Sequence, residues 1–284
     1  MYILFSPPQP TDSKNKLFNR FPMKLSFRRQ GWWMYIILFI ISQLSAAIFA
    51  FVLTHVVAGI PPSTLMAMAL LAANTLAILL FFCCRPQSVT LQHTLAGLKG
   101  RNGRRTGLVL LLALPMILLT HLMQEIFFPD IPDLVGEETF KTIIFHPLGL
   151  LTVSLLGPLA EELLFRGGVQ TDLTLNHSDQ GWAVPILLSA AIFTLIHMNP
   201  AQMPAAFILG CLLGYAYWWT GSLIAPVCIH VFNNSLASLL MNLFPDDDSL
   251  VAFLGGPTSA GITALVCCFF LFVMIRIIQH QHQE

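Results

Sequence analysis

Charge is the feature that this sequence has least of. Only 10% of its 284 residues are Asp, Glu, Lys or Arg, whereas 56% are hydrophobic, and the mean hydropathy is +0.73. The apolar residues come in long runs, which is typical of a polytopic membrane protein and excludes an ordinary soluble domain. The formal net charge is zero. Total charge therefore gives no support to nucleic-acid binding, and we expect no nucleic-acid partner.

The sequence also lacks the spacings of common metal and redox motifs. Its six cysteines lie in apolar segments without a CxxC pair or a Cys/His ligand spacing, and no HExxH sequence is present. These absences argue against a cysteine-based metal or redox centre and against an HExxH zinc site. We expect the cysteines to be core or lipid-facing residues.

Long apolar segments are what the sequence does contain. A membrane-spanning helix needs about 20 apolar residues, and the candidate spans are 32–57, 64–84, 106–128, 147–175, 182–198, 203–219, 222–243 and 258–278. The sequence therefore predicts an all-α polytopic membrane protein with about eight transmembrane helices. We expect a basic cytoplasmic tail over residues 1–30 and a single transmembrane helical domain over residues 31–279.

The charged residues are distributed unevenly between the loops. Lys and Arg concentrate in the tail and in the loop between the second and third spans, whereas the next loop is acidic. Basic loops tend to stay in the cytoplasm. Eight spans that start from an inside amino terminus would place both termini in the cytoplasm, and the short loops and compact size favour a bacterial inner membrane.

Two adjacent carboxylates and a guanidinium interrupt the fourth span, at Glu161, Glu162 and Arg166. A charged group near the centre of a membrane helix costs about 2.5–3.5 kcal/mol of insertion free energy, so we expect these groups to have a function. Glu162 and Arg166 are spaced i,i+4 in the favourable order for an ion pair, while Glu161 lies about 140° away from Arg166 around the helix. We therefore expect Arg166 to hold Glu162 and to leave Glu161 available for proton transfer.

Three more polar residues lie well inside predicted spans: His197, His230 and Asn234. His230 and Asn234 are four residues apart and share one helical face, whereas Asn233 points about 100° away. Asn234 is therefore the better partner of His230. We expect the other histidines, including His121 in the third span, to be ordinary interface, loop or solvent-facing residues.

The depth of these residues makes a prediction about the fourth helix. At about 1.5 Å per residue, Glu161 reaches the depth of the two histidines only if its helix continues past Gly168 to about Leu175. Pro158 should distort this helix just before Glu161 because proline removes a backbone hydrogen bond. We expect the polar residues to line a cavity within the helix bundle.

The three motifs together resemble a known family, the CPBP or Abi intramembrane proteases, which include the type II CAAX prenyl endopeptidases. The EExxxR, FxxxH and HxxxN motifs of this family are similar to residues 161–166, 193–197 and 230–234, within a family-like core at about 145–245. The resemblance implies a CAAX-type intramembrane endopeptidase that hydrolyses a peptide bond of a membrane-associated protein or peptide at the lipid bilayer.

The resemblance also implies residue roles. Glu161 and His197 would activate a water molecule, and His230 and Asn234 would donate hydrogen bonds to the oxyanion of the tetrahedral intermediate. Glu162 and Arg166 would be supporting residues. This division agrees with the angular argument, which singles out Glu161 without reference to the family.

Zinc is an alternative that the resemblance leaves open, because the family is often described as metalloproteases. Glu161, His197 and His230 would then be the ligands, with an open fourth position. We favour a glutamate-type mechanism without a metal, since it needs only a carboxylate, a histidine and polar donors.

A different class of function is a non-catalytic membrane protein: a transporter, or a binding or immunity protein that retains the fold. Transport predicts inverted repeats or paired half-helices around a midplane site, and the sequence shows neither. The convergence of several polar residues at one depth favours proteolysis. CAAX processing, peptide maturation, sorting-tail cleavage and bacteriocin self-immunity all fit the motifs, and oligomeric state is not set by them.

Overall fold

The computed structural model describes residues 31–85, 89, 100–134, 136–176, 181–244 and 249–280. Within these ranges the regular structure is entirely helical, and six helices are long and apolar enough to cross a membrane. The chain is thus an all-α polytopic membrane protein, as predicted. The basic tail expected at residues 1–30 lies outside the described residues.

All of the segments predicted to span the membrane are helical. They are α2 (Trp33–Val56), α3 (Pro62–Cys84), α5 (Gly100–Phe127), the continuous helix Pro147–Asn176, α10 (Ala183–Ile196), α11 (Met203–Thr220), α12 (Ile224–Leu243) and α14 (Pro257–His280). Of these, α10 has only 14 residues and α11 has 18. The sequence did not predict two short helices, α6 (Glu137–Ile144) and α13 (Leu250–Phe253), which lie in connections.

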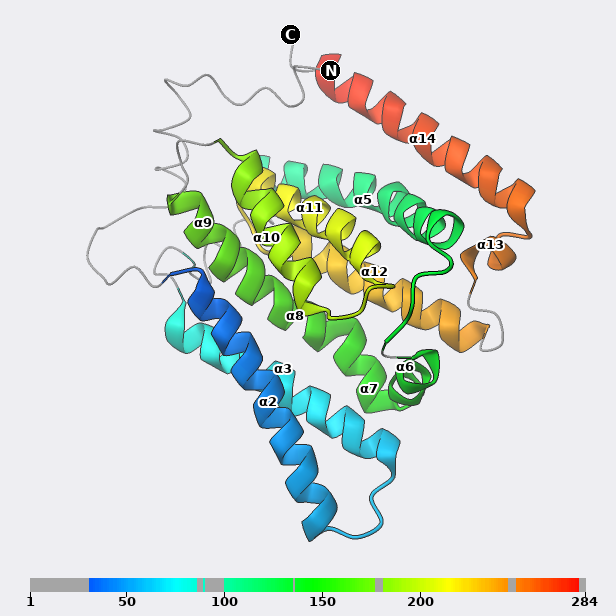
Figure 1. Ribbon diagram of the computed structural model, residues 1–284. Helices are drawn as coiled ribbons and strands as arrows, with labels where there is room; N and C mark the ends of the chain where they lie inside the picture. The colour runs from blue at the N-terminus through cyan, green and yellow to red at the C-terminus, as the bar shows by residue number, and fades with distance from the viewer. Residues whose placement is uncertain are drawn as a thin grey trace.

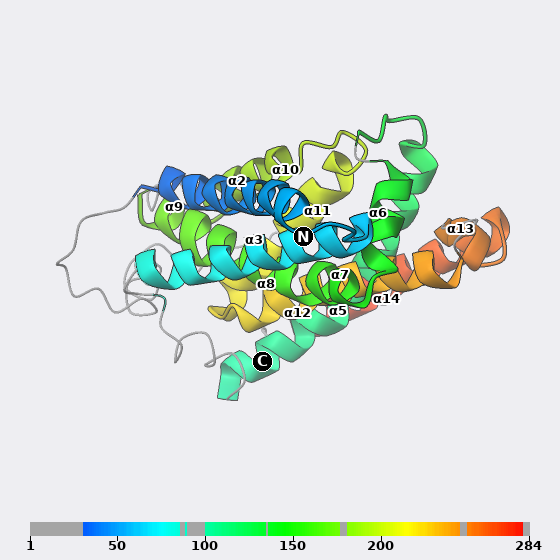
Figure 2. The ribbon, with the colours of Figure 1, turned by 90° about the horizontal axis from the view of Figure 1, so that it is seen from below.

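The helix from Pro147 to Asn176 forms the centre of the fold. It is built from α7 (Pro147–Leu151), α8 (Gly157–Glu162) and α9 (Thr171–Asn176), joined by the π-helical stretches η2 (Thr152–Leu156) and η3 (Leu163–Gln170). It packs against α2, α3, α10, α11 and α12 (Figure 1), and every residue of η3 is buried. Figure 2 shows α2 and α3 on one side of α7 and α8, with α12 and α5 on the other. The prediction that this helix continues past Gly168 is confirmed.

Pro158 explains the first π-helical stretch. The N–H of Gly157 bonds to the carbonyl of Thr152, five residues earlier, instead of to Val153. Pro158, the next residue that could reach the Val153 carbonyl, has no N–H to give. The Val153 oxygen is therefore left without a partner in its own helix and is open to a side chain from elsewhere.

Two adjacent glycines let α2 and α3 approach the central helix closely. A Cβ added at Gly167 would lie 2.8 Å from Cζ of Phe81 on α3, and one added at Gly168 would overlap the Tyr35 ring on α2. Small residues at helix contacts allow close packing in lipid, where hydrophobic burial cannot drive helices together. The glycine pair is therefore a packing feature of the site-bearing helix.

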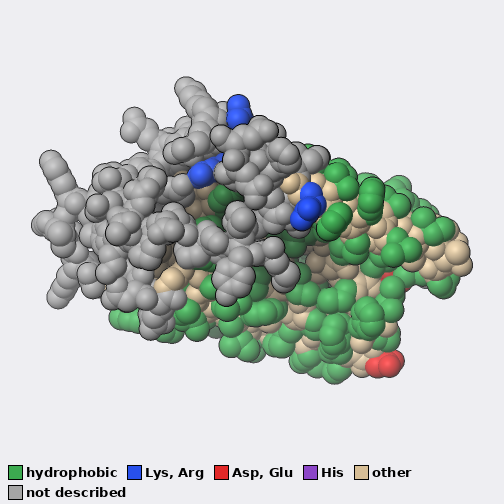
Figure 3. Space-filling model, turned by 90° about the horizontal axis from the view of Figure 1, so that it is seen from above, with side chains coloured by type: hydrophobic (Ala, Val, Ile, Leu, Met, Phe, Trp, Pro, Cys, Tyr) green, Lys and Arg blue, Asp and Glu red, His purple; other side chains and the backbone are tan. Residues whose placement is uncertain are grey.

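The periphery of the molecule is strongly apolar. The helix α14 packs mainly along α5 and α13, and large side chains such as Leu265 and Phe269 are exposed on it. In the part of Figure 3 that is not grey, most of the coloured side chains are hydrophobic, the Lys and Arg side chains lie beside the grey residues, and an Asp or Glu side chain lies at the far edge. This is the distribution expected of a surface that contacts lipid between two polar layers.

Candidate active site

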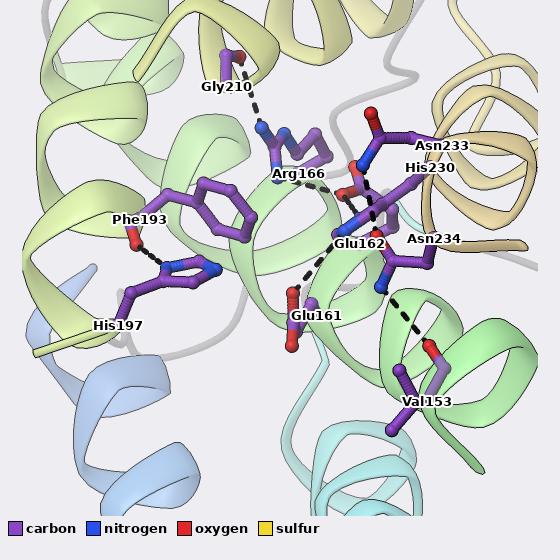
Figure 4. Close-up of polar contacts among 10 residues, drawn as sticks. All are labelled: Val153, Glu161, Glu162, Arg166, Phe193, His197, Gly210, His230, Asn233 and Asn234. Atoms are coloured by element: carbon purple, nitrogen blue, oxygen red, sulfur yellow. Dashed lines mark hydrogen bonds and ion pairs between the residues drawn. The ribbon is translucent and has the colours of Figure 1, made fainter. Parts of the chain in front are cut away.

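A buried cluster of charge lies where the central helix meets α12. The side chains of Glu162 and Arg166 are fully buried, and Arg166 Nη1 donates to Glu162 Oε1 over 2.9 Å. His230 Nδ1 lies 2.8 Å from the same carboxylate oxygen, and because that oxygen accepts, Nδ1 donates. Figure 4 shows the three side chains converging from the two helices. The predicted Glu162–Arg166 pair is thus present, with His230 as an additional partner.

Arg166 also reaches two other helices. Its Nη2 donates to the carbonyl of Gly210 on α11 over 3.0 Å, and its Cζ lies 4.7 Å from the ring centroid of Phe193 on α10. One turn further along, Gln170 Nε2 donates to the carbonyl of Gly214 over 2.9 Å. These contacts tie the central helix to α10 and α11 and fix the position of Glu162.

Glu161 is separated from this buried pair, as the angular argument predicted. Its side chain is 23% exposed, and its Oε2 lies 3.7 Å from His230 Nε2. In the described part of the chain the ion-pair partner of Arg166 is Glu162 and not Glu161. His230 therefore lies between two adjacent carboxylates, with Nδ1 bonded to Glu162 and Nε2 facing Glu161.

His197 lies at the end of α10, as its C-cap residue. Its Nδ1 is 2.8 Å from the carbonyl oxygen of Phe193, one turn earlier. A carbonyl only accepts, so Nδ1 carries the hydrogen and Nε2 presents a lone pair. The ring points from α10 toward α8 (Figure 4), but no hydrogen bond or ion pair joins it to Glu161 among the described residues.

Phe193 packs between the polar groups. Its ring meets those of His197 and His230 edge to face, with centroid distances of 4.7 and 5.8 Å, and it also contacts Phe165 at 5.4 Å. The sequence motif gave Phe193 no role of its own. The structure shows that it sets the spacing between the two histidines and covers the guanidinium of Arg166.

Asn234 belongs to a second polar group beside the first. Its Nδ2 donates to the free carbonyl of Val153 over 3.1 Å, and its Oδ1 accepts from Asn233 Nδ2 over 3.1 Å. Asn233 Oδ1 in turn lies 3.2 Å from His121 Nε2 on α5. We expected Asn233 to point away from His230 and His121 to be an ordinary interface or loop residue, whereas the structure joins both to Asn234. The available signal was that both are polar residues deep in apolar spans, which usually pair with one another.

The residues considered as zinc ligands do not form a ligand set. In the described part of the chain, no group of three or more His, Cys, Asp or Glu side chains is arranged to hold a metal ion. Glu161 approaches His230, but His197 stands apart from them beside Phe193. The described residues instead place a partly exposed carboxylate, Glu161, beside His230, with His197 and Asn234 on the neighbouring helices α10 and α12. These groups are of the kinds that can transfer protons and donate hydrogen bonds.

Known proteins resemble this chain in the segment that carries these residues. Residues 143–236 match the family model described as type II CAAX prenyl endopeptidase Rce1-like. The membrane-embedded CAAX protease MroQ of Staphylococcus aureus (strain USA300) is 30% identical over 118 residues, 39% of this chain and 48% of that protein. An uncharacterized 24.3 kDa protein of Escherichia coli is 28% identical over 116 residues, 39% of this chain and 51% of that protein.

The chain therefore spans about half the length of the curated relatives it matches. No solved structure matches it significantly. The family resemblance drawn from the three motifs is confirmed for the segment that holds all of the predicted site residues.

Proposed function

We propose that the protein is an intramembrane endopeptidase, because residues 143–236 match the family model described as type II CAAX prenyl endopeptidase Rce1-like. It hydrolyses a peptide bond of a membrane-associated protein or peptide. The observation that carries the proposal is the position of His230 between Glu162, at 2.8 Å, and Glu161, at 3.7 Å. A structural clamp needs only Glu162 and Arg166, whereas Glu161 is partly exposed and free of that pair.

Glu161 is the proposed general base. Its carboxylate takes a proton from a water molecule, whose oxygen attacks the carbonyl carbon of the peptide bond. The C–N bond then breaks, and the proton passes to the leaving nitrogen. His197 assists at the same water, because its hydrogen-bonded Nδ1 leaves the Nε2 lone pair available as an acceptor. Both side chains are partly exposed, and the proposed reaction uses these exposed sides for the approach of water and substrate.

Asn234 and His230 are the proposed donors to the oxyanion. Asn234 Nδ2 has two hydrogens, and Val153 takes one of them. The other is left for the developing negative charge. Donation from His230 Nε2 requires a proton there while Nδ1 donates to Glu162, so this role uses the imidazolium form. Pre-aimed donors of this kind stabilise a tetrahedral intermediate more than the ground state.

Glu162 and Arg166 are proposed to support the reaction without touching the substrate. Both are fully buried, and Glu162 holds His230 by its Nδ1. We propose a glutamate-type mechanism without a metal. Its support is that Glu161, His197 and His230 do not converge as ligands among the described residues.

The variant Glu161→Gln tests the proposal. It keeps the size of the side chain but removes the base, so cleavage should fall by about 10²–10⁴-fold, the usual contribution of general acid–base catalysis. The measurement is mass spectrometry of membrane proteins from cells that express the wild type or the variant. A peptide that forms only with the wild type identifies the substrate.

Glu138→Gln is the matched control, because Glu138 lies on α6 with a side chain that is 91% exposed. This variant should cleave at the wild-type rate. Full cleavage by Glu161→Gln would refute the assignment, and an unchanged cellular phenotype in that variant would favour a non-catalytic binding or immunity role.

A further inference from the structure

A network of three hydrogen bonds links α5, through the proposed oxyanion donor Asn234, to the central helix. They run from His121 to Asn233 (3.2 Å), from Asn233 to Asn234 (3.1 Å) and from Asn234 to the Val153 carbonyl (3.1 Å). We propose that His121 and Asn233 are positioning residues that hold the Asn234 amide in one orientation for catalysis. The proposal rests on the peptidase function proposed above, and it adds a residue from outside the segment that matches the family.

The order of donors and acceptors in this hydrogen-bond network is set by the Val153 carbonyl. The Val153 carbonyl can only accept, and the π-helical stretch and Pro158 have left it without a partner in its own helix. Asn234 must therefore turn its nitrogen toward Val153, which turns its oxygen toward Asn233. Figure 4 shows the amide held between these two contacts.

The same reasoning fixes the orientation of the Asn233 amide and the position of the hydrogen on the His121 ring. Asn233 gives its nitrogen to Asn234, so its oxygen faces His121 and needs a donor. His121 Nε2 must then carry a hydrogen. Asn233, which the helical projection had turned away from the site, thus acts through its neighbour and not through the substrate.

The helix α5 holds His121, one end of this hydrogen-bond network, in a fixed position. It packs against α11, α12, α13 and α14, and its carboxylate Glu125 receives hydrogen bonds from Ser249, the N-cap residue of α13, and from the N–H of Val251 within α13. His121 lies one turn before Glu125. Its ring is therefore carried by a helix that is held on several sides.

Without His121, the Asn233 amide loses the donor that fixes its orientation. A rotated Asn233 would turn its oxygen toward the Asn234 oxygen, and Asn234 would keep only its contact with Val153. An Asn234 amide held by Val153 alone is less firmly oriented, so its second Nδ2 hydrogen is aimed less well at the developing oxyanion. The change weakens stabilisation of the negative charge in the transition state and leaves substrate binding unchanged. A positioning role therefore predicts a lower kcat with an unchanged KM.

The activity experiment compares variants at position 121. It measures the formation of the peptide that appears with the wild type and not with Glu161→Gln. His121→Leu removes the donor and should lower kcat about tenfold, the smaller end of the effect of outer-shell partners. His121→Gln places an amide N–H near the position of Nε2 and should restore most of that loss. Asn234→Ala should lose more, about 10²–10³-fold, as for a direct oxyanion donor.

Thr120→Val is the matched control on the same helix, since the Thr120 hydroxyl bonds only to the Met116 carbonyl in the described contacts. This variant should keep the wild-type kcat. Equal activity of wild type and His121→Leu, or a His121→Gln variant as impaired as His121→Leu, would overturn the positioning role.

A second measurement needs no turnover. In protein labelled with ¹⁵N-histidine and reconstituted in bilayers, the His121 ring resonances are identified by their loss in His121→Leu. Asn233→Ala should shift them, because the hydrogen-bond acceptor of Nε2 is gone. Unshifted resonances would show that His121 does not donate to Asn233 and would overturn the proposed hydrogen-bond network. Because this readout does not depend on cleavage, it separates a failure of this proposal from a failure of the proposed peptidase function.

Discussion

At the scale of single residues, Arg166 shows how a full charge is kept inside a membrane helix. Its guanidinium donates to Glu162 and to the Gly210 carbonyl, and it lies over the Phe193 ring. Removing one partner of a buried pair typically costs about 3–5 kcal/mol, because the other charge remains unpaired. The supporting role of Glu162 and Arg166 is therefore inseparable from the folding of this part of the chain.

The proposal of a mechanism without a metal also belongs to the scale of single residues. Zinc bound by Glu161, His197 and His230 would need three donors within about 2.0–2.2 Å of one point. We expect purified protein to cleave its peptide at an unchanged rate after chelation and to contain no stoichiometric zinc. Elemental analysis and cleavage assays before and after chelation are the measurements. Stoichiometric zinc whose removal stops cleavage, with activity restored on adding it back, would overturn the glutamate-type proposal.

Sequence reasoning found the local part of the site and missed the tertiary part. The Glu162–Arg166 pair follows from helical spacing alone, because both residues lie on one helix. The bond from His230 to Glu162 joins residues 68 positions apart, and no spacing rule indicates it. His121 and Asn233 were passed over because the angular argument treats one helix at a time, whereas their contact depends on how α5 and α12 pack.

At the scale of elements, the lengths of the helices could be predicted and their irregularities could not. Apolar runs marked every long helix, including the extension of the fourth to Asn176. The π-helical stretches were not expected, although Pro158 explains η2. The short helices α6 and α13 were missed because they are too short to give an apolar run.

Close packing of these elements leads to a stability prediction. Gly168→Ala should destabilise the protein by about 1–3 kcal/mol, because the added methyl overlaps the fully buried Tyr35 ring and overpacking is costly. Gly107→Ala on α5 is the matched control, since nothing lies within 4 Å of its added Cβ. It should be neutral or slightly stabilising, given the better helix propensity of alanine. Unfolding midpoints in detergent give the comparison, and equal midpoints would contradict it.

At the scale of the whole molecule, the distribution of charge predicts an orientation. Arg104 and Arg105 lie near the start of α5, while Asp130 and Asp133 follow its end. We propose that the basic ends face the cytoplasm of a bacterial inner membrane and that both termini are cytoplasmic. The hydropathy pattern predicted the fold class, but the order in which the helices pack around Pro147–Asn176 depends on side-chain contacts that hydropathy does not encode.

Fusions to alkaline phosphatase measure this orientation, because that enzyme needs disulfides that form only outside the cytoplasm. Fusions after Gly59 and Asp130 should be active, and fusions after Arg85 and Gly221 should be inactive. Comparable expression of all four is the control. The reversed pattern would mean that the basic ends face outward.

The shortness of α10 has a consequence for the lipid around it. Its 14 residues cover about 21 Å at 1.5 Å per residue, whereas the hydrocarbon layer is about 30 Å thick. A helix shorter than the layer is accommodated by local thinning of the bilayer and by flanking polar groups that reach toward the surface. His197 lies where α10 ends. The bilayer beside the proposed catalytic residues is therefore expected to be at its thinnest. Thinner lipid there would bring water closer to a membrane-bound peptide, and the rate of the proposed peptidase would then depend on the acyl-chain length of the membrane.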